Sequence, residues 1–448
     1  MKRTPSIEDL QFSRRSALKG LAAAAGAVTV PGVLAACSSS SSSSSSTASG
    51  GSSSSAGGTI SFGSNYSDPA PKQAFAALVG NAKKATGVSV TVNTVDHNTF
   101  QQDITSYLQG APNDLATWFA GYRMQYFAAQ GLLEPVDDVW DKIGANFSDA
   151  VKALCKGADG RYYFVPVYNY PWVVFYNKST FTQKGYTVPA TWDDMITLAK
   201  KMQKDGLVPF AFADKDQWPA LGMFDILNLR INGFEYHINL MHNKASYSDP
   251  QVSAVFKQWT ELLPYLQTGA AGRIWEDAAK TLESKQAGMM FQGTNQVAAQ
   301  YVADGKKLDD LAFFPFPTIN PAYGQDYMDA PMDGFILPAK AKNKAAAKQV
   351  LEYIGTGGAE ASYLKYDSWD VAVATGASVP SYNAIQTASV QAISTLKGVA
   401  QFGDRDTAPP MATALETSIL SFIANPTTAN AKSQQSSLAS QAKSIFGS

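Results

Sequence analysis

A serine-rich run near the start of the chain separates two parts that cannot fold in the same way. From Ser38 to Gly58 almost every residue is Ser or Gly, so the run has nothing to bury that would offset the entropy of ordering it. We therefore expect residues 37–58 to form a flexible tether. The roughly 390 residues that follow exceed the 250 to 300 at which a single hydrophobic core stops growing, which predicts two lobes with a cleft between them.

The segment before the tether has the features of an export signal. The pair Arg14-Arg15 precedes an apolar run from Leu21 to Ala36 that carries no charge. At about 16 residues this run is shorter than the roughly 20 that span a membrane. Residues 1–36 are therefore expected to be a signal peptide that resembles the twin-arginine type, with general secretion left open. Leu34-Ala35-Ala36-Cys37 resembles a bacterial lipobox, so Cys37 is the expected lipidation site and the outer face of the cell membrane the expected location.

The composition argues against several classes of function. With 36 basic and 37 acidic residues the net charge is −1, and the chain lacks the basic excess that nucleic-acid binding requires. Its three His and two Cys are too few for the clusters that hold zinc or iron–sulfur groups, so we expect no metal and no cofactor. A Gly-x-Ser-x-Gly turn and a metalloprotease motif are both absent from the sequence, and no enzyme is expected.

Short alternating or apolar runs, separated by helical patterns, predict an α/β fold class for the body. The helical patterns cover residues 71–85, 341–354 and 427–446, a helix that opens at Asp249-Pro250, and one capped by Thr191. On the helix that opens at Pro250, Trp259 belongs to the apolar face and is expected in the core. The expected strands are residues 59–62, 88–92, 115–119, 163–167, 173–176, 288–291, 311–314 and 334–338.

Several short motifs follow one another at the spacing of a known family. They are Asn113-Asp114-Leu115, Trp118 to Arg123, Gly131 to Pro135, Gly160 to Pro166, Phe175 to Lys178, Thr191 to Asp194, Ala287 to Gly293 and Asp333-Gly334-Phe335. In these motifs the chain resembles the extracellular solute-binding proteins of ABC importers, specifically the sugar-binding group that includes maltose-binding protein. The resemblance covers most of the body.

The resemblance implies a periplasmic-binding-protein-like fold of two α/β lobes with three crossings between them and a central ligand cleft. Lobe 1 would comprise residues 59–169 and 327–372, and lobe 2 residues 170–326 and 373–448. The implied function is carbohydrate capture by hinge closure, followed by delivery to an ABC permease in the membrane. The implied protein is a monomer that needs no cofactor.

A pyranose has an apolar C–H face and a rim of hydroxyl groups, so its site needs aromatic side chains together with planar polar groups. The stretch Tyr168, Asn169, Tyr170, Pro171 and Trp172 supplies both, and the resemblance places it at the first crossing. Tyr170 stands where maltose-binding protein has a ligand-contacting carboxylate, a departure that implies a different specificity. Hinge packing remains the alternative role for these aromatic residues.

Other candidates come from the resemblance and from their position at strand ends or crossings. Arg123 matches an arginine that the resemblance places at the sugar; the alternative is a surface arginine in an ion pair. Trp118 is a candidate whose alternative role is packing in the strand core. Thr294 is a candidate whose alternative role is capping a helix. The further candidates are Tyr122, Trp218, Gln292, Gly293, Asp329, Asp333, Trp369 and Asp370.

Three rival functions are left open. The same fold could bind a polyamine or another small solute, because acidic residues lie near the aromatic ones. A polysaccharide hydrolase would need a pair of carboxylates across a cleft, and Asp214 with Asp216, or Asp329 with Asp333, are the available pairs. The third alternative is a structural surface lipoprotein that binds no solute.

Overall fold

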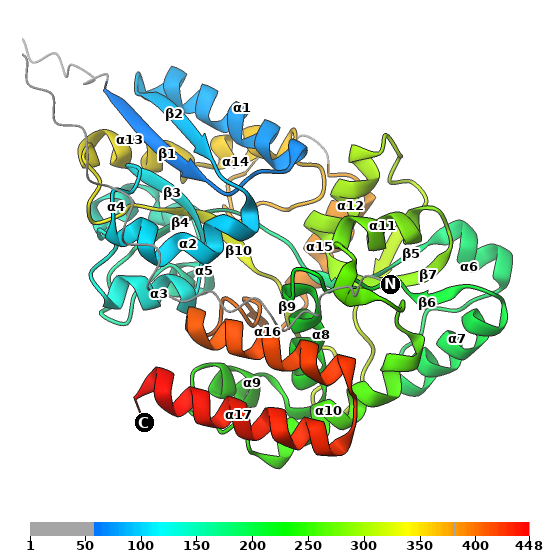
Figure 1. The fold of residues 1–448 in the computed structure, drawn as a ribbon. Helices are drawn as coiled ribbons and strands as arrows, with labels where there is room; N and C mark the ends of the chain where they lie inside the picture. Colours follow the sequence, from blue (N-terminus) through cyan, green and yellow to red (C-terminus); the bar gives the residue numbers. More distant parts are fainter. Residues whose placement is uncertain (1–57, 378, 380–381, 448) are drawn as a thin grey trace, which may run out of the picture. The chain divides into compact units, whose positions relative to one another are not determined.

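The computed structural model describes residues 58–377, 379 and 382–447 (Figure 1). The expected signal peptide, Cys37 and the tether lie outside these residues. The body belongs to one compact unit, Ser54–Ser448. In the described part of the chain, no helix has both the length and the apolar character needed to cross a membrane.

The first of two main sheets has the strand order β2-β1-β3-β10-β4. β1 pairs in parallel with β2 and β3, whereas β10 lies antiparallel between β3 and β4. β3 and β10 are buried at every residue, as strands covered on both faces must be. The strands are β1 (Thr59–Ser64), β2 (Ser89–Thr94), β3 (Leu115–Phe119), β4 (Phe164–Asn169) and β10 (Met332–Ile336). Helices of this half are α1 (Pro69–Thr86), α2 (His97–Gln109), α3 (Tyr122–Ala129), α4 (Asp137–Ile143), α5 (Asp149–Leu154), α13 (Lys344–Ile354) and α14 (Gly357–Leu364).

The second sheet has the order β6-β7-β5-β8. Its central strand β5 runs antiparallel to both β7 and β8, and β6 is parallel to β7. The strands are β5 (Trp172–Asn177), β6 (Val208–Phe210), β7 (Ala287–Gly293) and β8 (Leu311–Phe314). Helices α6 (Lys178–Lys184), α7 (Trp192–Lys204), α11 (Trp275–Glu283), α12 (Thr294–Ala303) and α15 (Ala384–Ser394) contact these strands or one another.

A group of helices lies beside the second sheet, around the long apolar helix α8 (Trp218–Asn232) (Figure 1). α8 contacts α9 (Phe234–Met241), α10 (Pro250–Leu262) and α16 (Pro409–Ala424), and α17 (Thr428–Phe446) returns along α16 and α10. Twelve consecutive residues of α8 are buried. A helix that is buried on every side needs neighbours all round, and the polar residues among these twelve are Asp225, Asn228 and Arg230.

The chain passes between the two halves three times. It leaves β4 for β5 across only two residues, returns from β8 to β10, and leaves α14 for α15. The first and third crossings are joined by a bridge between Asn169 and Val371. The second is joined to the segment that follows α15 by a small parallel ladder of β9 (Tyr327–Asp329) with β11 (Gly398–Ala400).

The structure confirms the strong sequence signals and corrects the weak ones. The capping box at Thr191 is present with Asp194 as the reciprocal residue, and Trp259 is fully buried. The helix that opens at Pro250 is shorter than its apolar pattern, because a 3-10 turn, Leu263–Tyr265, containing a proline follows α10. β10 begins two residues earlier than predicted. The strands β6, β9 and β11 were not predicted, since three residues are too few to show an alternation.

Candidate ligand-binding site

Three adjoining cavities lie between residues of the two halves, and Trp218 lines all of them. Their volumes are about 420, 280 and 40 Å³. The larger two are within or close to the range typical of small-ligand pockets, roughly 300 to 1,000 Å³. The smallest cavity contains the residues of a buried network of ion pairs and hydrogen bonds. Its lining residues are His97, Gln101, Tyr170, Trp172, Trp218, Asn295, Gln296, Asp333, Phe402, Asp404 and Arg405.

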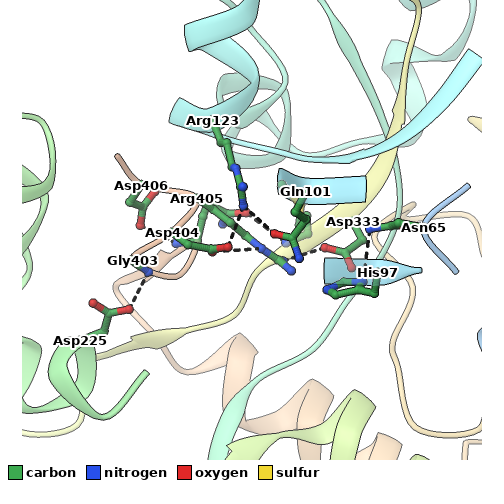
Figure 2. Close-up of polar contacts among 12 residues, drawn as sticks. Asn65, His97, Gln101, Arg123, Asp225, Asp333, Gly403, Asp404, Arg405 and Asp406 are labelled. Carbon is green, nitrogen blue, oxygen red and sulfur yellow. Dashed lines mark hydrogen bonds and ion pairs between the residues drawn. The ribbon is translucent and has the colours of Figure 1, made fainter. Parts of the chain in front are cut away.

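The centre of the site is Arg405, whose side chain is 8% exposed (Figure 2). Its Nη1 donates to Asp333 Oδ1 at 2.7 Å, and its guanidinium lies 3.9 Å from the centre of the Phe119 ring. Burial alone lowers the pKa of Arg405, but Asp333 and the neighbouring Tyr170 and Asp404 more than offset burial, so its pKa is raised. Arg405 Nε has no hydrogen-bond partner among the described residues, which leaves a charged donor for a ligand.

Asp333 lies at an irregularity in the pairing of β10 with β4. Asp333 pairs with Tyr168 but Gly334 pairs with Pro166, so β4 carries one extra residue here, a β-bulge of the kind that redirects side chains. The bulge needs a glycine, because a Cβ at Gly334 would lie 2.2 Å from the Val165 carbonyl oxygen. Tyr168 donates to Asp333 Oδ2 at 3.0 Å, so both carboxylate oxygens are engaged. Burial raises the pKa of Asp333.

A second buried ion pair continues the network. Arg123 Nη1 donates to Asp404 Oδ2 and to Gln101 Oε1, each at 2.7 Å (Figure 2). Asp404 Oδ1 has no hydrogen-bond partner in the described structure, although it lies 3.7 Å from Arg405 Nε. Asp404 and Arg405 therefore offer an acceptor and a donor side by side, which is the pattern that pairs of sugar hydroxyl groups recognise.

Aromatic rings form the apolar side of the site. Trp172 stacks on Phe402 with 4.6 Å between ring centres, and Trp218 meets Trp172 edge-on at 6.2 Å. Phe402 has a φ of 96°, a conformation that costs a non-glycine residue free energy. Trp172 and Phe402 fit against α8 because residue 222 is glycine; a Cβ there would lie 2.5 Å from the Trp172 ring.

The start of α12 supplies two amide groups. Asn295 Oδ1 and Gln296 Oε1 are buried without hydrogen-bond partners in the described structure. Gly293, the residue that caps α12, makes room for them, since a Cβ there would lie 2.4 Å from Gln296 Oε1 and 2.7 Å from Asn295 Oδ1. Gly293 itself lines none of the three cavities.

The 280 Å³ cavity has an acidic wall. Asp370 Oδ1 is buried without a hydrogen-bond partner among the described residues, and burial raises the pKa of Asp370. His97 stands between this cavity and the smallest one. Burial and the nearby Arg405 lower the pKa of His97 to about 4, so the imidazole is neutral at pH 7. The acidic residues of this cavity are Asp68, Asp96, Asp216, Glu276, Asp333, Asp367 and Asp370.

Comparison with known proteins places the chain in a family. Residues 66–361 match the bacterial extracellular solute-binding proteins, which is more than half of the chain. The chain belongs to this family. The bacterial solute receptor AcbH, described with an exclusive preference for β-D-galactopyranose, is 64% identical; its structure superimposes with a TM-score of 0.85 over 87% of this chain and 99% of AcbH.

Curated relatives of this solute-binding protein are more distant. An uncharacterized ABC transporter extracellular-binding protein of Pyrococcus horikoshii, PH1214, is 28% identical over 64% of this chain. The alpha-glucosides-binding periplasmic protein AglE of Rhizobium meliloti is 24% identical over 63% of this chain. The matched stretch spans 65% of the length of each relative. The predicted fold class, two α/β lobes, and the resemblance to sugar-binding members of the family are confirmed.

The residues predicted for the site of this solute-binding protein fall into two groups. Those that line the cavities are Arg123, Tyr168, Tyr170, Trp172, Trp218, Asp333, Trp369 and Asp370. Those that do not line these three cavities are Trp118, Tyr122, Asn169, Gln292, Gly293, Thr294 and Asp329. Trp118 is 1% exposed and packs edge-on against Phe127, and Tyr122 lies beside His242.

Sequence reasoning missed several lining residues. The segment 401–408, all of it buried, contributes Phe402, Asp404 and Arg405, and α2 contributes His97 and Gln101. An Asp-Arg-Asp triplet normally indicates a solvated loop. The only sequence signal that sets this triplet apart from a solvated loop is the apolar residues on either side of it. Asn295 and Gln296 could have been predicted from the sequence, because they directly follow the candidate residue Thr294 at the start of a helix.

Proposed function

We propose that this protein is the sugar receptor of an ABC importer and that its ligand is a single hexopyranose, with β-D-galactopyranose as the first candidate. The observation that carries the proposal is the group of three adjoining cavities around Trp218, the smallest of which brings Arg405 and Asp404 together with the Trp172–Phe402 stack. The likeness to AcbH, at 64% identity, supports the choice of galactopyranose.

The chemistry of the site matches one pyranose ring. Trp172, Trp218 and Phe402 offer apolar surface for the C–H face of the ring. The free atoms Arg405 Nε, Asp404 Oδ1 and the amide oxygens of Asn295 and Gln296 offer one donor and three acceptors to its hydroxyl groups. Capture then requires groups from both halves, so that sugar contacts favour the closed arrangement.

We also propose that the chain has the two lobes, export signal and lipid anchor predicted from its sequence. Lobe 1 would comprise residues 59–169 and 327–372, and lobe 2 residues 170–326 and 373–448. The protein would be a monomer, exported by a twin-arginine-like signal, anchored by a lipid on Cys37 at the cell surface, and engaged by an ABC permease. It would bind its sugar without chemical conversion. Mass spectrometry of the membrane-extracted protein tests the anchor, and Cys37→Ala should release the protein into the medium.

A cationic ligand is the second candidate, and one observation favours it. The acidic wall of the 280 Å³ cavity adjoins Trp218 and Trp275, and carboxylates combined with aromatic faces bind ammonium groups. A polyamine would therefore enter this cavity and leave the Trp172–Phe402 stack uncontacted.

Isothermal titration calorimetry of the purified protein with galactose, glucose, maltose, raffinose and spermidine decides between these ligands. We expect galactose to bind and Trp218→Ala to weaken that binding about fivefold or more, because a stacking face that contributes about 1 kcal/mol or more is removed. Tyr366→Ala, which removes an exposed ring, is the control and should bind like the parent protein. Binding of spermidine with no response to any sugar would replace the sugar proposal with the cationic one.

A further inference from the structure

A cluster of buried side chains lies behind the sugar-binding segment. It consists of Asp225 in α8, His237 in α9 and Asp329 in β9, all 0% exposed. One ligating atom from each lies within 4.8 Å of the other two, and His237 Nε2 is 3.9 Å from Asp225 Oδ1. The composition argued against a metal site because it counted Cys and His, but here the fold assembles one His with two carboxylates.

The atoms that face one another in this cluster have no hydrogen-bond partners among the described residues. They are Asp225 Oδ1, His237 Nε2 and both carboxylate oxygens of Asp329. Buried polar atoms are nearly always satisfied by the protein, by water or by an ion. A carboxylate with two buried oxygens and no donor, as in Asp329, is the strongest sign in the described structure that a group is held here.

The charges around the cluster are also unbalanced. Asp225, Asp329 and the neighbouring Asp406 are three buried carboxyl groups, and Arg230 is the cation whose charge acts on Asp329. Two nitrogens of Arg230 are committed elsewhere, because Nε donates to the Phe316 carbonyl at 3.0 Å and Nη1 donates to the Tyr327 carbonyl; Nη2 has no hydrogen-bond partner among the described residues. A divalent cation would supply the missing two charges.

We propose that Asp225, His237 and Asp329 form a buried binding site for a divalent cation, with Zn²⁺ as the ion that best suits one imidazole nitrogen and two carboxylate oxygens. Three protein ligands of this kind are typical of zinc sites with a fourth position for water. Coordination through Nε2 puts the imidazole proton on Nδ1. In this structure Asn228 Nδ2 lies 3.1 Å from Nδ1, and Asn228 Oδ1 accepts from Asn232 Nδ2 at 2.8 Å. Metal coordination through Nε2 therefore requires the Asn228 amide to turn over, so that its oxygen accepts a hydrogen bond from Nδ1–H.

The cation would be structural, and it would hold the segment that carries Arg405. Asp225 Oδ2 accepts a hydrogen bond of 2.5 Å from the Gly403 backbone N–H (Figure 2). A Cβ at Gly403 would lie 2.7 Å from Asp225 Oδ1, so only glycine lets the segment approach the cluster this closely. The site thus joins α8, α9 and β9 directly, and the segment 401–407 through Asp225.

Elemental analysis by mass spectrometry measures the metal content of the purified protein, before and after unfolding and refolding with EDTA or with ZnCl₂. We expect about one Zn²⁺ per chain after refolding with zinc, and at least tenfold less in Asp329→Asn and in His237→Gln, since each removes one of three ligands. Asp326→Asn is the matched control, because Asp326 lies three residues away in an exposed pair with Lys397; it should retain the metal.

Refolding the unmodified protein with Co²⁺ gives a readout that needs no variant. A Co²⁺ ion in a four-coordinate, tetrahedral site of three protein ligands and one water shows strong visible d–d bands, whereas octahedral aqueous Co²⁺ shows weak ones. Absence of both bound zinc and the cobalt bands in well-folded parent protein would show that the cluster holds water only, and would overturn the proposal. Full zinc content in both ligand variants would equally overturn it.

Discussion

At the scale of single residues, Arg405 connects more of the binding site than any other side chain described here. It contacts Asp333 by a hydrogen bond, approaches Asp404, and lies against the rings of Phe119 and Tyr170. Each contact uses the flat shape of the guanidinium as well as its charge. The sequence pattern could not reveal this role, because nothing local distinguishes a buried Arg405 from an exposed one. Its partners come from β3 and β10, which are distant in sequence.

Arg405→Lys tests whether the shape matters. Lysine keeps the charge but loses the planar fork, so we expect the dissociation constant for the sugar to rise at least tenfold. The free energy of unfolding should fall by about 1 to 3 kcal/mol, because Asp333 keeps a charged neighbour but loses a well-placed donor. Calorimetry and urea unfolding measure the two effects. Arg161→Lys, in an exposed pair with Asp137, should change neither; wild-type sugar affinity in Arg405→Lys would contradict the role assigned to Arg405.

At the scale of elements, sequence signals predicted the helices best where capping residues and an apolar stripe agreed. Thr191 and Asp249 with Pro250 are the clearest examples. Strands longer than three residues were also predicted, whereas β9 and β11 owe their existence to their pairing with each other.

α14 shows another effect that the sequence pattern alone does not reveal. Its Glu360 is 0% exposed, and one carboxylate oxygen accepts from the backbone N–H groups of Val373 and Ala374.

Glu360→Gln should stabilise the protein more at high pH than at low pH. Burial raises the pKa of Glu360 from 4.5 to about 8. Between these values the folded chain keeps a proton that the unfolded chain releases, so the free energy of unfolding falls as the pH rises from about 4.5 to 8. Glutamine has no proton to lose and keeps one oxygen acceptor.

Thermal unfolding at pH 5, 6.5 and 8 measures this difference. The gain in melting temperature of Glu360→Gln over the parent should grow steadily across the series. Glu352→Gln, on the surface beside Lys142, serves as the comparison and should show no such trend. A constant or shrinking gain for Glu360→Gln would mean that Glu360 is ionised in the folded protein at pH 6.5.

At the scale of the whole molecule, length predicted two lobes, but only the resemblance to a known family predicted that the chain crosses between them three times. No periodicity indicates that β10 belongs with strands more than 150 residues earlier in the chain. The halves also meet through single contacts. Asn98 in α2 donates to Asp216 Oδ1, just before α8, at 3.2 Å.

Asn98→Ala should weaken sugar binding without lowering the stability of the unliganded protein. If closure forms the Asn98–Asp216 contact, its loss costs about 1 kcal/mol in the closed form only, which is roughly a fivefold rise in the dissociation constant. Calorimetry measures the affinity, and thermal unfolding without sugar measures the stability. Asn81→Ala, at a half-buried position of α1 that lines none of the three cavities, should match the parent in both. Unchanged affinity in Asn98→Ala would exclude this contact from closure.

The place of β10 between β3 and β4 has a consequence for how the chain is made. β3 ends at Phe119 and β10 begins at Met332, so a ribosome adding 5 to 20 residues per second needs roughly 10 to 40 s to supply the missing strand. Until then β3 and β4 each have an open edge, a state prone to wrong pairing. During that interval a chaperone has unpaired strands to recognise, and the first sheet reaches its native pairing only after every strand of the second has been synthesised.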